Sequence, residues 1–571
     1  MKKLFFVLAF LLVGAMAYGQ GEPAKAKKAK RAVTAQPVDC LDCEIEKMGP
    51  EERGADVNTN KLTQTGLSNS ATVLQIGLGN KSTVDQDGKN QSFTGGYDND
   101  VKVYQRGTKN ETYIDQNGDM NTGRVTQFGE MNYAEQKVGV GYAENNTATS
   151  YQSGKKNTSL QEQYYDNNEA HVIQDGEENY AKQYQSSGAD GVAGSYAWAR
   201  QDGYRNMSEQ VQNGSDNSSI VDQDGSYNMA HTNQATSSGG ENDSDIEQDG
   251  RANLACVDQV ASYGGDNDSD IDQDGYRNRA SVKQSSTGRF ADNDSDIDQE
   301  GRYNKAAVDQ TGYYGDNDSD IDQDGTLNRA SARQVASSGG DNDSDIDQDG
   351  WRNRAVVDQR ASTRGDNDSD IDQESSRYGN YASVIQRASY YGDNDSDIDQ
   401  DGNRNSAVVN QYARGYSADN DSDIDQEGYR NYASVRQTAY TRSDNDSDIN
   451  QDGRYNRAMV EQSASTGGDN DSDIDQDGTA NFASALQRAS RGGMNTSEID
   501  QDGYRNSACV DQSARGGFNE SDILQSGSFN SASVVQTSLP GYSNTSCITQ
   551  TGRGNSACVQ QTGTPVSGGG L

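Results

Sequence analysis

The stretch SDIDQDGYRNRASVKQ, from Ser269–Gln284, contains two alternating segments separated by a turn. In the first segment, Ile271 and Gln273 alternate with aspartates, which is the pattern of a β-strand whose two faces differ chemically. The Asp-Gly pair that ends at Gly275 favours a turn. Beyond it, the alternation resumes at Asn278. The stretch therefore predicts a strand, a turn and a second strand, which together form one flat rung.

The same pattern recurs along the chain. An isoleucine marks thirteen regular copies, 24 to 27 residues apart: Ile246, Ile271, Ile297, Ile321, Ile346, Ile371, Ile398, Ile424, Ile449, Ile474, Ile499, Ile523 and Ile548. Upstream, glutamines spaced by 11 residues, such as Gln64, Gln75 and Gln86, mark less regular copies. Such a period is typical of solenoids, in which one unit cannot bury its apolar face but a stack can.

We therefore predict an all-β protein, a β-solenoid of about 20 stacked strand–turn–strand rungs with a period of about 22–25 residues. The irregular repeats occupy residues 61–235 and the thirteen regular repeats occupy residues 236–561. At about 4.8 Å per rung, the stack would extend for ~100 Å.

Alternation also predicts which side chains point into the stack. Stacked glutamine and asparagine amides can hydrogen-bond to their own copies on the rungs above and below. In three representative rungs, the predicted inward ladder comprises Ile271, Gln273, Gly275, Asn278, Ala280, Val282, Gln284, Ile297, Gln299, Asn304, Gln310, Ile499, Gln501, Asn506 and Gln512.

Composition favours a different interpretation. The mean hydropathy of −1.02 and the net charge of −40 are typical of chains that cannot collapse. A disordered acidic matrix protein that binds cations or mineral is therefore an alternative. The fixed offsets between Gln, Gly, Asn and Ala favour an ordered stack, because a disordered spacer has no need of them.

These offsets resemble a known family. Gln273, Gly275, Asn278, Ala280 and Gln284 reproduce the Q-x-G-x-x-N-x-A-x-x-x-Q core of the curlin repeat, which occurs in the subunits of curli, the amyloid fibres of bacterial biofilms. The resemblance implies a secreted β-solenoid that polymerises end to end outside the cell and mediates adhesion. Its implied partners are further copies of itself, a nucleator subunit and an outer-membrane secretion channel.

The chain also departs from the family pattern. Asn267 stands where the family has Ser, and Ser269 stands at a place that is commonly apolar in curlins. The rung that begins at Ile371 has Ser375 in place of Gly and two extra turn residues. Known curlins also have far fewer repeats.

Acidic residues fill the outward positions of the regular repeats. Asp270, Asp272, Asp274 and Gly275 match the first half of a calcium-binding loop, but the twelfth place is Ser281 rather than Glu. Aligned charges one rung apart repel by about 0.9 kcal/mol even at the dielectric constant of water. The face could be a solvated surface that delays assembly, a site of calcium-linked assembly, or a set of dedicated calcium sites. A calcium-stabilised monomeric adhesin therefore stays open as an alternative function. The net charge disfavours nucleic acid as a partner.

The first residues predict export. Residues 1–19 combine a basic start with a short apolar run and small residues, which is the pattern of a secretory signal peptide. Residues 20–60 are a flexible basic and polar segment suited to secretion targeting, and residues 562–571 form a disordered tail. Elsewhere the chain has no segment apolar enough to be embedded in a membrane. The Cys40–Cys43 pair lacks neighbours that would define a zinc site.

Catalysis is not predicted. The chain contains only two histidines, and no Ser or Cys nucleophile has a plausible base partner. Paired carboxylates occur in nearly every regular repeat, so no single pair stands out as an active site. Cys547 and Cys558 belong to opposite faces of one rung, so we expect no disulfide between them.

Overall fold

The computed structural model describes residues 57–87, 98–140, 143–188, 192–338, 341–364, 366–416 and 418–563. The predicted signal peptide, nearly all of the segment 20–60 with its cysteine pair, and residues 564–571 of the predicted tail lie outside the described residues. The regular elements of the described residues are β-strands. Within them, no helix is long and apolar enough to cross a membrane.

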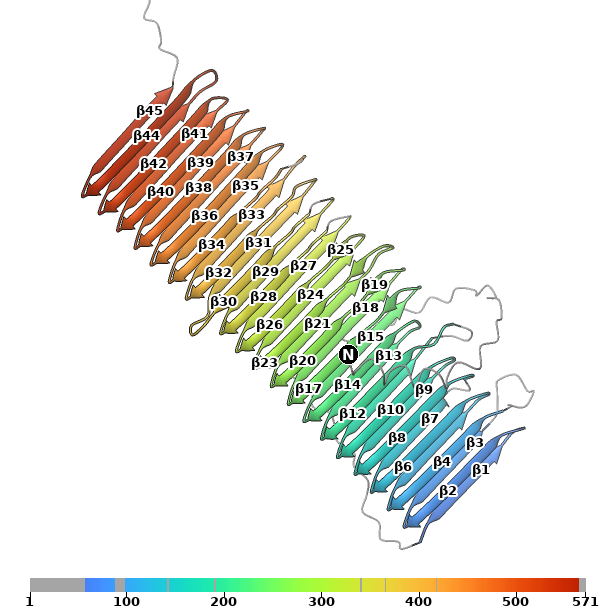
Figure 1. Ribbon diagram of the computed structural model, residues 1–571. Helices are drawn as coiled ribbons and strands as arrows, with labels where there is room; N and C mark the ends of the chain where they lie inside the picture. Colours follow the sequence, from blue (N-terminus) through green and yellow to red (C-terminus); the bar gives the residue numbers. More distant parts are fainter. Residues whose placement is uncertain are drawn as a thin grey trace, which may run out of the picture. The chain divides into compact units, whose positions relative to one another are not determined.

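The strands form two long parallel sheets that face each other (Figure 1). Sheet 1 contains the strands that precede the glycine turn: β2 (Ser70–Leu78), β4 (Asp100–Thr108), β6 (Thr122–Glu130), β8 (Thr147–Lys155), β10 (Glu169–Glu177), β12 (Tyr196–Tyr204), β14 (Ser218–Ser226), β17 (Asp245–Arg251), β20 (Asp270–Tyr276), β23 (Asp296–Arg302), β26 (Asp320–Thr326), β28 (Asp345–Trp351), β30 (Asp370–Ser375), β32 (Asp397–Asn403), β34 (Asp423–Tyr429), β36 (Asp444–Arg454), β38 (Asp469–Thr479), β40 (Met494–Tyr504), β42 (Phe518–Ser528) and β44 (Ser543–Arg553).

Sheet 2 has 21 strands. They are β1 (Thr59–Thr65), β3 (Lys81–Asp87), β5 (Glu111–Asn117), β7 (Tyr133–Val140), β9 (Thr158–Tyr164), β11 (Tyr180–Ser186), β13 (Met207–Asn213), β15 (Met229–Ser237), β18 (Leu254–Ser262), β21 (Arg279–Ser286), β24 (Lys305–Tyr313), β27 (Arg329–Ser337), β29 (Arg354–Ser362), β31 (Tyr381–Ser389), β33 (Ser406–Arg414), β35 (Tyr432–Tyr440), β37 (Arg457–Ser465), β39 (Phe482–Ser490), β41 (Ser507–Arg515), β43 (Ser531–Ser538) and β45 (Ser556–Gly563).

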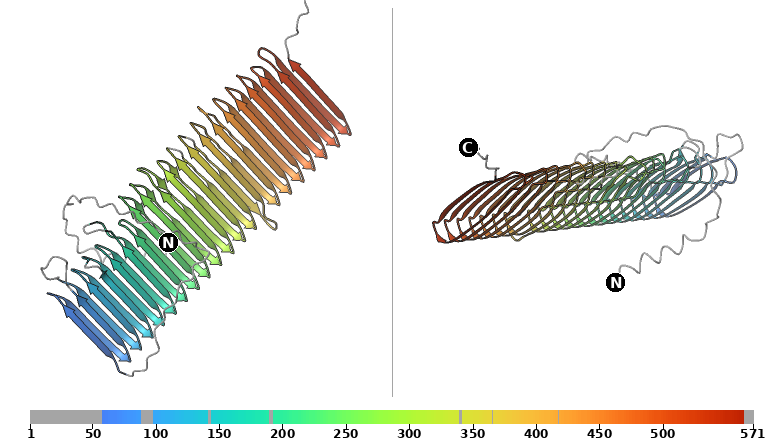
Figure 2. Two further views of the ribbon diagram at one scale, coloured as in Figure 1. Left: turned by 180° about the vertical axis from the view of Figure 1, so that it is seen from behind. Right: turned by 90° about the horizontal axis from the view of Figure 1, so that it is seen from above.

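A strand of sheet 1 and the strand of sheet 2 that follows it form one rung. Twenty rungs run from β2–β3 to β44–β45, and β1 precedes them as a single strand. The strands follow chain order along both sheets (Figure 2). Four two-residue strands pair with one another in a separate short sheet: β16 (Glu241–Asn242), β19 (Asp266–Asn267), β22 (Asp292–Asn293) and β25 (Asp316–Asn317). The prediction of an all-β solenoid of about 20 rungs is confirmed.

Each residue pairs with its own counterpart on the next rung. In sheet 1, Gln273 pairs with Gln248 on one side and Gln299 on the other. In sheet 2, Gln284 pairs with Gln310. This register follows from the repeat, because a shift by one residue would turn every inward side chain outward.

The glycine turn needs glycine because consecutive rungs lie so close together. At Gly275, φ is +118°, and a Cβ atom there would lie 2.1 Å from the carbonyl oxygen of Gly301. Two residues later, Arg277 adopts a left-handed conformation with φ of 58°. Asn278 then closes the turn, since its Nδ2 donates to the carbonyl oxygen of Asp274 at 2.9 Å. A side chain at the glycine position would strike the next rung.

The rung of β30 and β31 solves this problem differently. Ser375 occupies the glycine position, and its hydroxyl contacts the backbone of Trp351 at 3.0 and 3.1 Å. In this longer turn, Gly379 also lies close to the preceding rung, where a Cβ atom would be 1.7 Å from the carbonyl oxygen of Arg352. Asn380 still closes the turn, because its Nδ2 donates to the carbonyl oxygen of Glu374 at 3.0 Å. The insertion is therefore accommodated locally.

The apolar core is a thin column between the two sheets. Ile271 of β20 and Ala280 and Val282 of β21 are buried, with exposed fractions of 0, 3 and 0%. The equivalent residues of the other regular rungs join them in one continuous cluster. Amides fill the remaining inward positions.

Candidate functional site

The inward glutamines of sheet 1 form one hydrogen-bonded ladder. Gln273 Nε2 donates to Gln299 Oε1 at 2.7 Å, and Gln299 Nε2 donates to Gln323 Oε1 at 2.7 Å. The ladder begins with Gln75, which donates to Gln105, and ends where Gln525 donates to Gln550. Each donor points toward the C-terminal rung, so the ladder has a direction.

Sheet 2 carries a second glutamine ladder with the same direction. Gln284 Nε2 donates to Gln310 Oε1 at 2.9 Å. Val138 takes the place of glutamine in β7, opposite Gln116. On the next rung, Gln163 Oε1 is buried and accepts no hydrogen bond within the described residues. The substitution therefore shows what a missing amide does to its neighbour.

The turn asparagines form a third ladder that runs the other way. The backbone N–H of Asn304 donates to Asn278 Oδ1 at 3.0 Å, and that of Asn278 donates to Asn253 Oδ1 at 3.0 Å. Asn278 Nδ2 also reaches the carbonyl oxygen of Gln299 at 3.2 Å. Each turn asparagine from Asn253 to Asn530 thus bonds to both neighbouring rungs, which stabilises the turn and the stack together.

The structure brings the predicted inward residues together as stacked columns. Fourteen of them are buried with exposed fractions of 3% or less: Ile271, Gln273, Asn278, Ala280, Val282, Gln284, Ile297, Gln299, Asn304, Gln310, Ile499, Gln501, Asn506 and Gln512. Gly275 lies at the turn and is half-buried.

The amide ladder that contains Asn267 was not among the predicted ladders. The predicted ladder left out Asn267, although the alternation places Asn267 on the same face as Ile271 and Gln273. Asn267 is fully buried, and its Nδ2 donates to Asn242 Oδ1 at 2.7 Å. Farther along, Asn317 donates to Asn342 at 2.6 Å. The signal was present in the sequence, because asparagine recurs between two aspartates in most regular repeats.

The outer face of sheet 1 carries columns of aligned carboxylates over the regular rungs. Partial burial and the aspartates of neighbouring rungs, Asp296 first, raise the pKa of Asp320 to about 6. Burial and Asp270 raise the pKa of Asp245 to about 7. Both causes disfavour the charged form. Among the described residues, no group of three or more His, Cys, Asp or Glu side chains is arranged to hold a metal ion.

These acidic columns stop before the last rung. In β44, the outward positions hold Thr545, Cys547, Thr549 and Thr551 instead of carboxylates. Cys547 and Cys558 are both exposed free thiols.

At the opposite end, the outward positions of β2 hold Thr72, Leu74 and Ile76. Leu74 and Ile76 are 50 and 46% exposed. The two ends of the stack are therefore less charged than its regular middle.

Comparison with known families agrees with this geometry. The family model described as the curlin associated repeat matches residues 58–88, 96–129, 239–275, 315–350 and 443–478. No curated protein matches the chain. The matched segments each include a strand of sheet 1 and recur from the first rungs to the regular repeats. The chain therefore carries curlin associated repeats in these five segments.

Proposed function

We propose that this protein is a secreted structural subunit that assembles end to end into curli-like extracellular amyloid-type fibres. Such fibres would belong to a biofilm matrix or a cell surface and would mediate adhesion. Curlin repeats on a β-solenoid fit a curli-like structural protein, and the curlin-repeat family is structural, non-enzymatic and associated with an extracellular location. A nucleator subunit and an outer-membrane secretion channel are the further partners that this function requires.

The observation that carries the proposal is the complementarity of the two ends. At the C-terminal end, Gln550 and Gln561 have no further rung to which their Nε2 groups can donate within the described residues. At the N-terminal end, Gln75 and Gln64 begin their ladders, so their Oε1 atoms are available as acceptors. A second copy placed head to tail continues both ladders without changing their direction.

The strands fit the same junction. All pairings within sheets 1 and 2 are parallel, so β1 of a second copy can extend sheet 2 beyond β45, and β2 can extend sheet 1 beyond β44. An open parallel edge presents unpaired backbone groups that act as a template for another strand. The partly buried Ala71 and Val73 of β2 would then meet the last rung, which lacks acidic columns.

The direct test is assembly of the purified chain without residues 1–19. Thioflavin fluorescence is followed over time in EDTA and, in parallel, in millimolar calcium. Growth of signal in EDTA, followed by fibres that pellet, supports calcium-independent assembly. A flat trace in EDTA refutes calcium-independent assembly, and growth in calcium alone would favour calcium-linked assembly.

A proline variant tests the junction itself. The N–H of Ser531 in β43 donates to the carbonyl oxygen of Asn555 on the following rung, and Ser556 is the counterpart of Ser531 in β45. Because N–H direction alternates along a parallel strand, the N–H groups of Ser556 and of Cys558, two residues later, both face the open end. Cys558→Pro removes that donor without removing a bond within the chain. We expect Cys558→Pro to keep the strand content of the monomer and to abolish growth, whereas Cys558→Ser grows normally. Normal growth of Cys558→Pro would refute the head-to-tail junction.

A further inference from the structure

A strip of arginine and aromatic side chains runs along the glycine-turn edge of the regular rungs. We call the two residues that follow each turn glycine the turn edge. From residue 251 to residue 554, it contains no Asp or Glu. Its arginines include Arg277, Arg352, Arg404, Arg430, Arg454 and Arg505. One edge of an otherwise strongly acidic protein is therefore basic.

Aromatic rings lie against five of these six guanidinium groups, those of Arg277, Arg352, Arg404, Arg430 and Arg505. Arg277 lies 5.0 Å from the ring centre of Tyr276 on its own rung and 5.8 Å from that of Tyr303 on the next rung. Arg430 makes the same pair of contacts with Tyr429 and Tyr455, at 5.2 and 5.6 Å. Cation–π contacts leave the edges of the guanidinium free to donate hydrogen bonds. The strip is thus an ordered array of cations.

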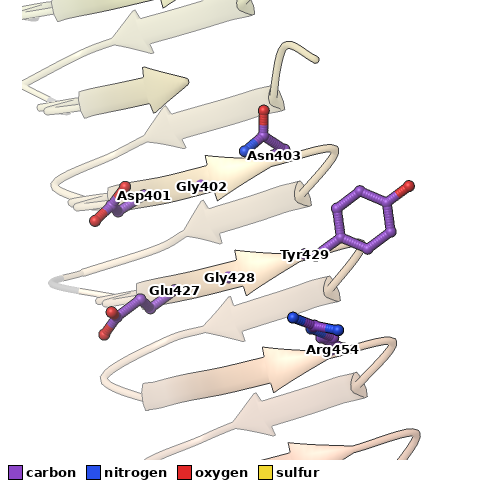
Figure 3. Close-up of a pocket in the computed structure, with 7 residues that line it drawn as sticks. All are labelled: Asp401, Gly402, Asn403, Glu427, Gly428, Tyr429 and Arg454. Carbon is purple, nitrogen blue, oxygen red and sulfur yellow. The ribbon is translucent and has the colours of Figure 1, made fainter. Parts of the chain in front are cut away.

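The carboxylates of the same copy do not neutralise this array. Among the described residues, none of the six arginines named above forms an ion pair with a carboxylate, whereas Arg333 and Arg488 on the outer face of sheet 2 do form such pairs. Asp401 and Glu427 line one side of an open cavity of about 580 Å³, and Tyr429 and Arg454 line the other side (Figure 3). The turn edge therefore keeps unused donor capacity beside open space.

We infer that the turn edge of one copy docks laterally on the acidic outer face of sheet 1 of a second copy. Both surfaces follow the same rung spacing, so each arginine of the turn edge on one stack can face a column of carboxylates on the other. A few rungs, such as those with Thr326–Leu327 or Thr479–Ala480 at the turn edge, contribute no arginine. A polymer of another kind has no such guaranteed match. Docking also places cations beside columns in which like charges lie one rung apart, such as Asp320 between Asp296 and Asp345. Fibres would therefore associate side by side through charge, in addition to growing at their ends.

The test separates lateral docking from end-to-end growth. In the Cys558→Pro background, Arg277, Arg352, Arg404, Arg430 and Arg505 are all changed to Glu in one variant and to Lys in a matched control. Sedimentation velocity at 0.15 M and 1 M NaCl measures self-association. At 0.15 M NaCl, we expect the parent and the Lys control to self-associate, and the Glu variant to self-associate more weakly by about tenfold or more. At 1 M NaCl, we expect the self-association of the parent and of the Lys control to be lost.

Two results would overturn the inference. One is self-association of the Glu variant as strong as that of the parent. The other is a parent chain that stays monomeric at 0.15 M NaCl but binds dextran sulfate through the same arginines. That result would mean that the turn edge binds a free anionic polymer. If Cys558→Pro does not block fibre growth, that result contradicts the head-to-tail junction alone. Lateral docking is then tested by comparing the widths of Glu-variant and Lys-variant fibres in electron micrographs.

Discussion

Replacing Gln299 with leucine should weaken the stack at a defined place. Gln299 lies in the middle of the unbroken sheet 1 ladder, accepts from Gln273 and donates to Gln323, both at 2.7 Å. In Gln299→Leu, Gln273 Nε2 keeps one acceptor, the carbonyl oxygen of Leu254 at 3.2 Å. Gln323 Oε1 loses its ladder donor, just as Gln163 Oε1 lacks one beside Val138.

The expected cost follows from these two losses. An orphaned buried acceptor and one lost hydrogen bond together cost about 2–4 kcal/mol. Because a solenoid rung contacts mainly its neighbours, the effect should be local. Amide hydrogen exchange through local opening should then be about 30- to 1,000-fold faster in β20, β23 and β26. Strands far along the stack, such as β44, should exchange as before.

Hydrogen exchange followed by mass spectrometry measures this directly. Ser331→Ala is the matched control, since Ser331 lies on the outer side of β27 and takes no part in the inward ladders. It should leave exchange unchanged. If Gln299→Leu changes exchange in β23 by less than twofold, the amide ladder does not stabilise the stack.

Three further predictions concern charge, the turn and the cysteines. Burial and neighbouring carboxylates raise the pKa of Asp320 and of Asp345 to about 6, so the folded state binds more protons than the unfolded state between about pH 4 and 6. Stability should therefore rise as the pH falls from 8 through 6 toward about 4.5, as measured by urea unfolding, and a fall over that range would contradict it. Gly301→Ala places a Cβ atom 2.1 Å from a carbonyl oxygen at φ of +107° and should cost about 1–3 kcal/mol or more of unfolding free energy in the same assay. An unchanged urea midpoint would show that the turn relaxes. Mild oxidation should produce no Cys547–Cys558 link within a chain, because the two exposed thiols lie on the outer sides of different sheets. Peptide mapping under non-reducing conditions detects such a link.

Much of the fold follows from the order of residues alone. Period-two alternation around Ile271 and Gln273 predicts a strand and its inward face. A repeat near 25 residues then places equal residues above one another, since each rung must meet its copy. The inward amides, the glycine turn and the outward aspartates are therefore all visible in one copy of the repeat.

The directions of the ladders and the contacts between different rungs required the tertiary structure. Whether an amide donates forward, as Gln273 does, or a backbone N–H donates backward, as that of Asn278 does, depends on atoms about 25 residues away. The same holds for the break at Val138, which leaves Gln163 Oε1 on the next rung without a donor. Local sequence determines which face a side chain occupies, because alternation is a property of one strand. Only the stacked rungs determine what that side chain meets, because its partners belong to other turns of the solenoid.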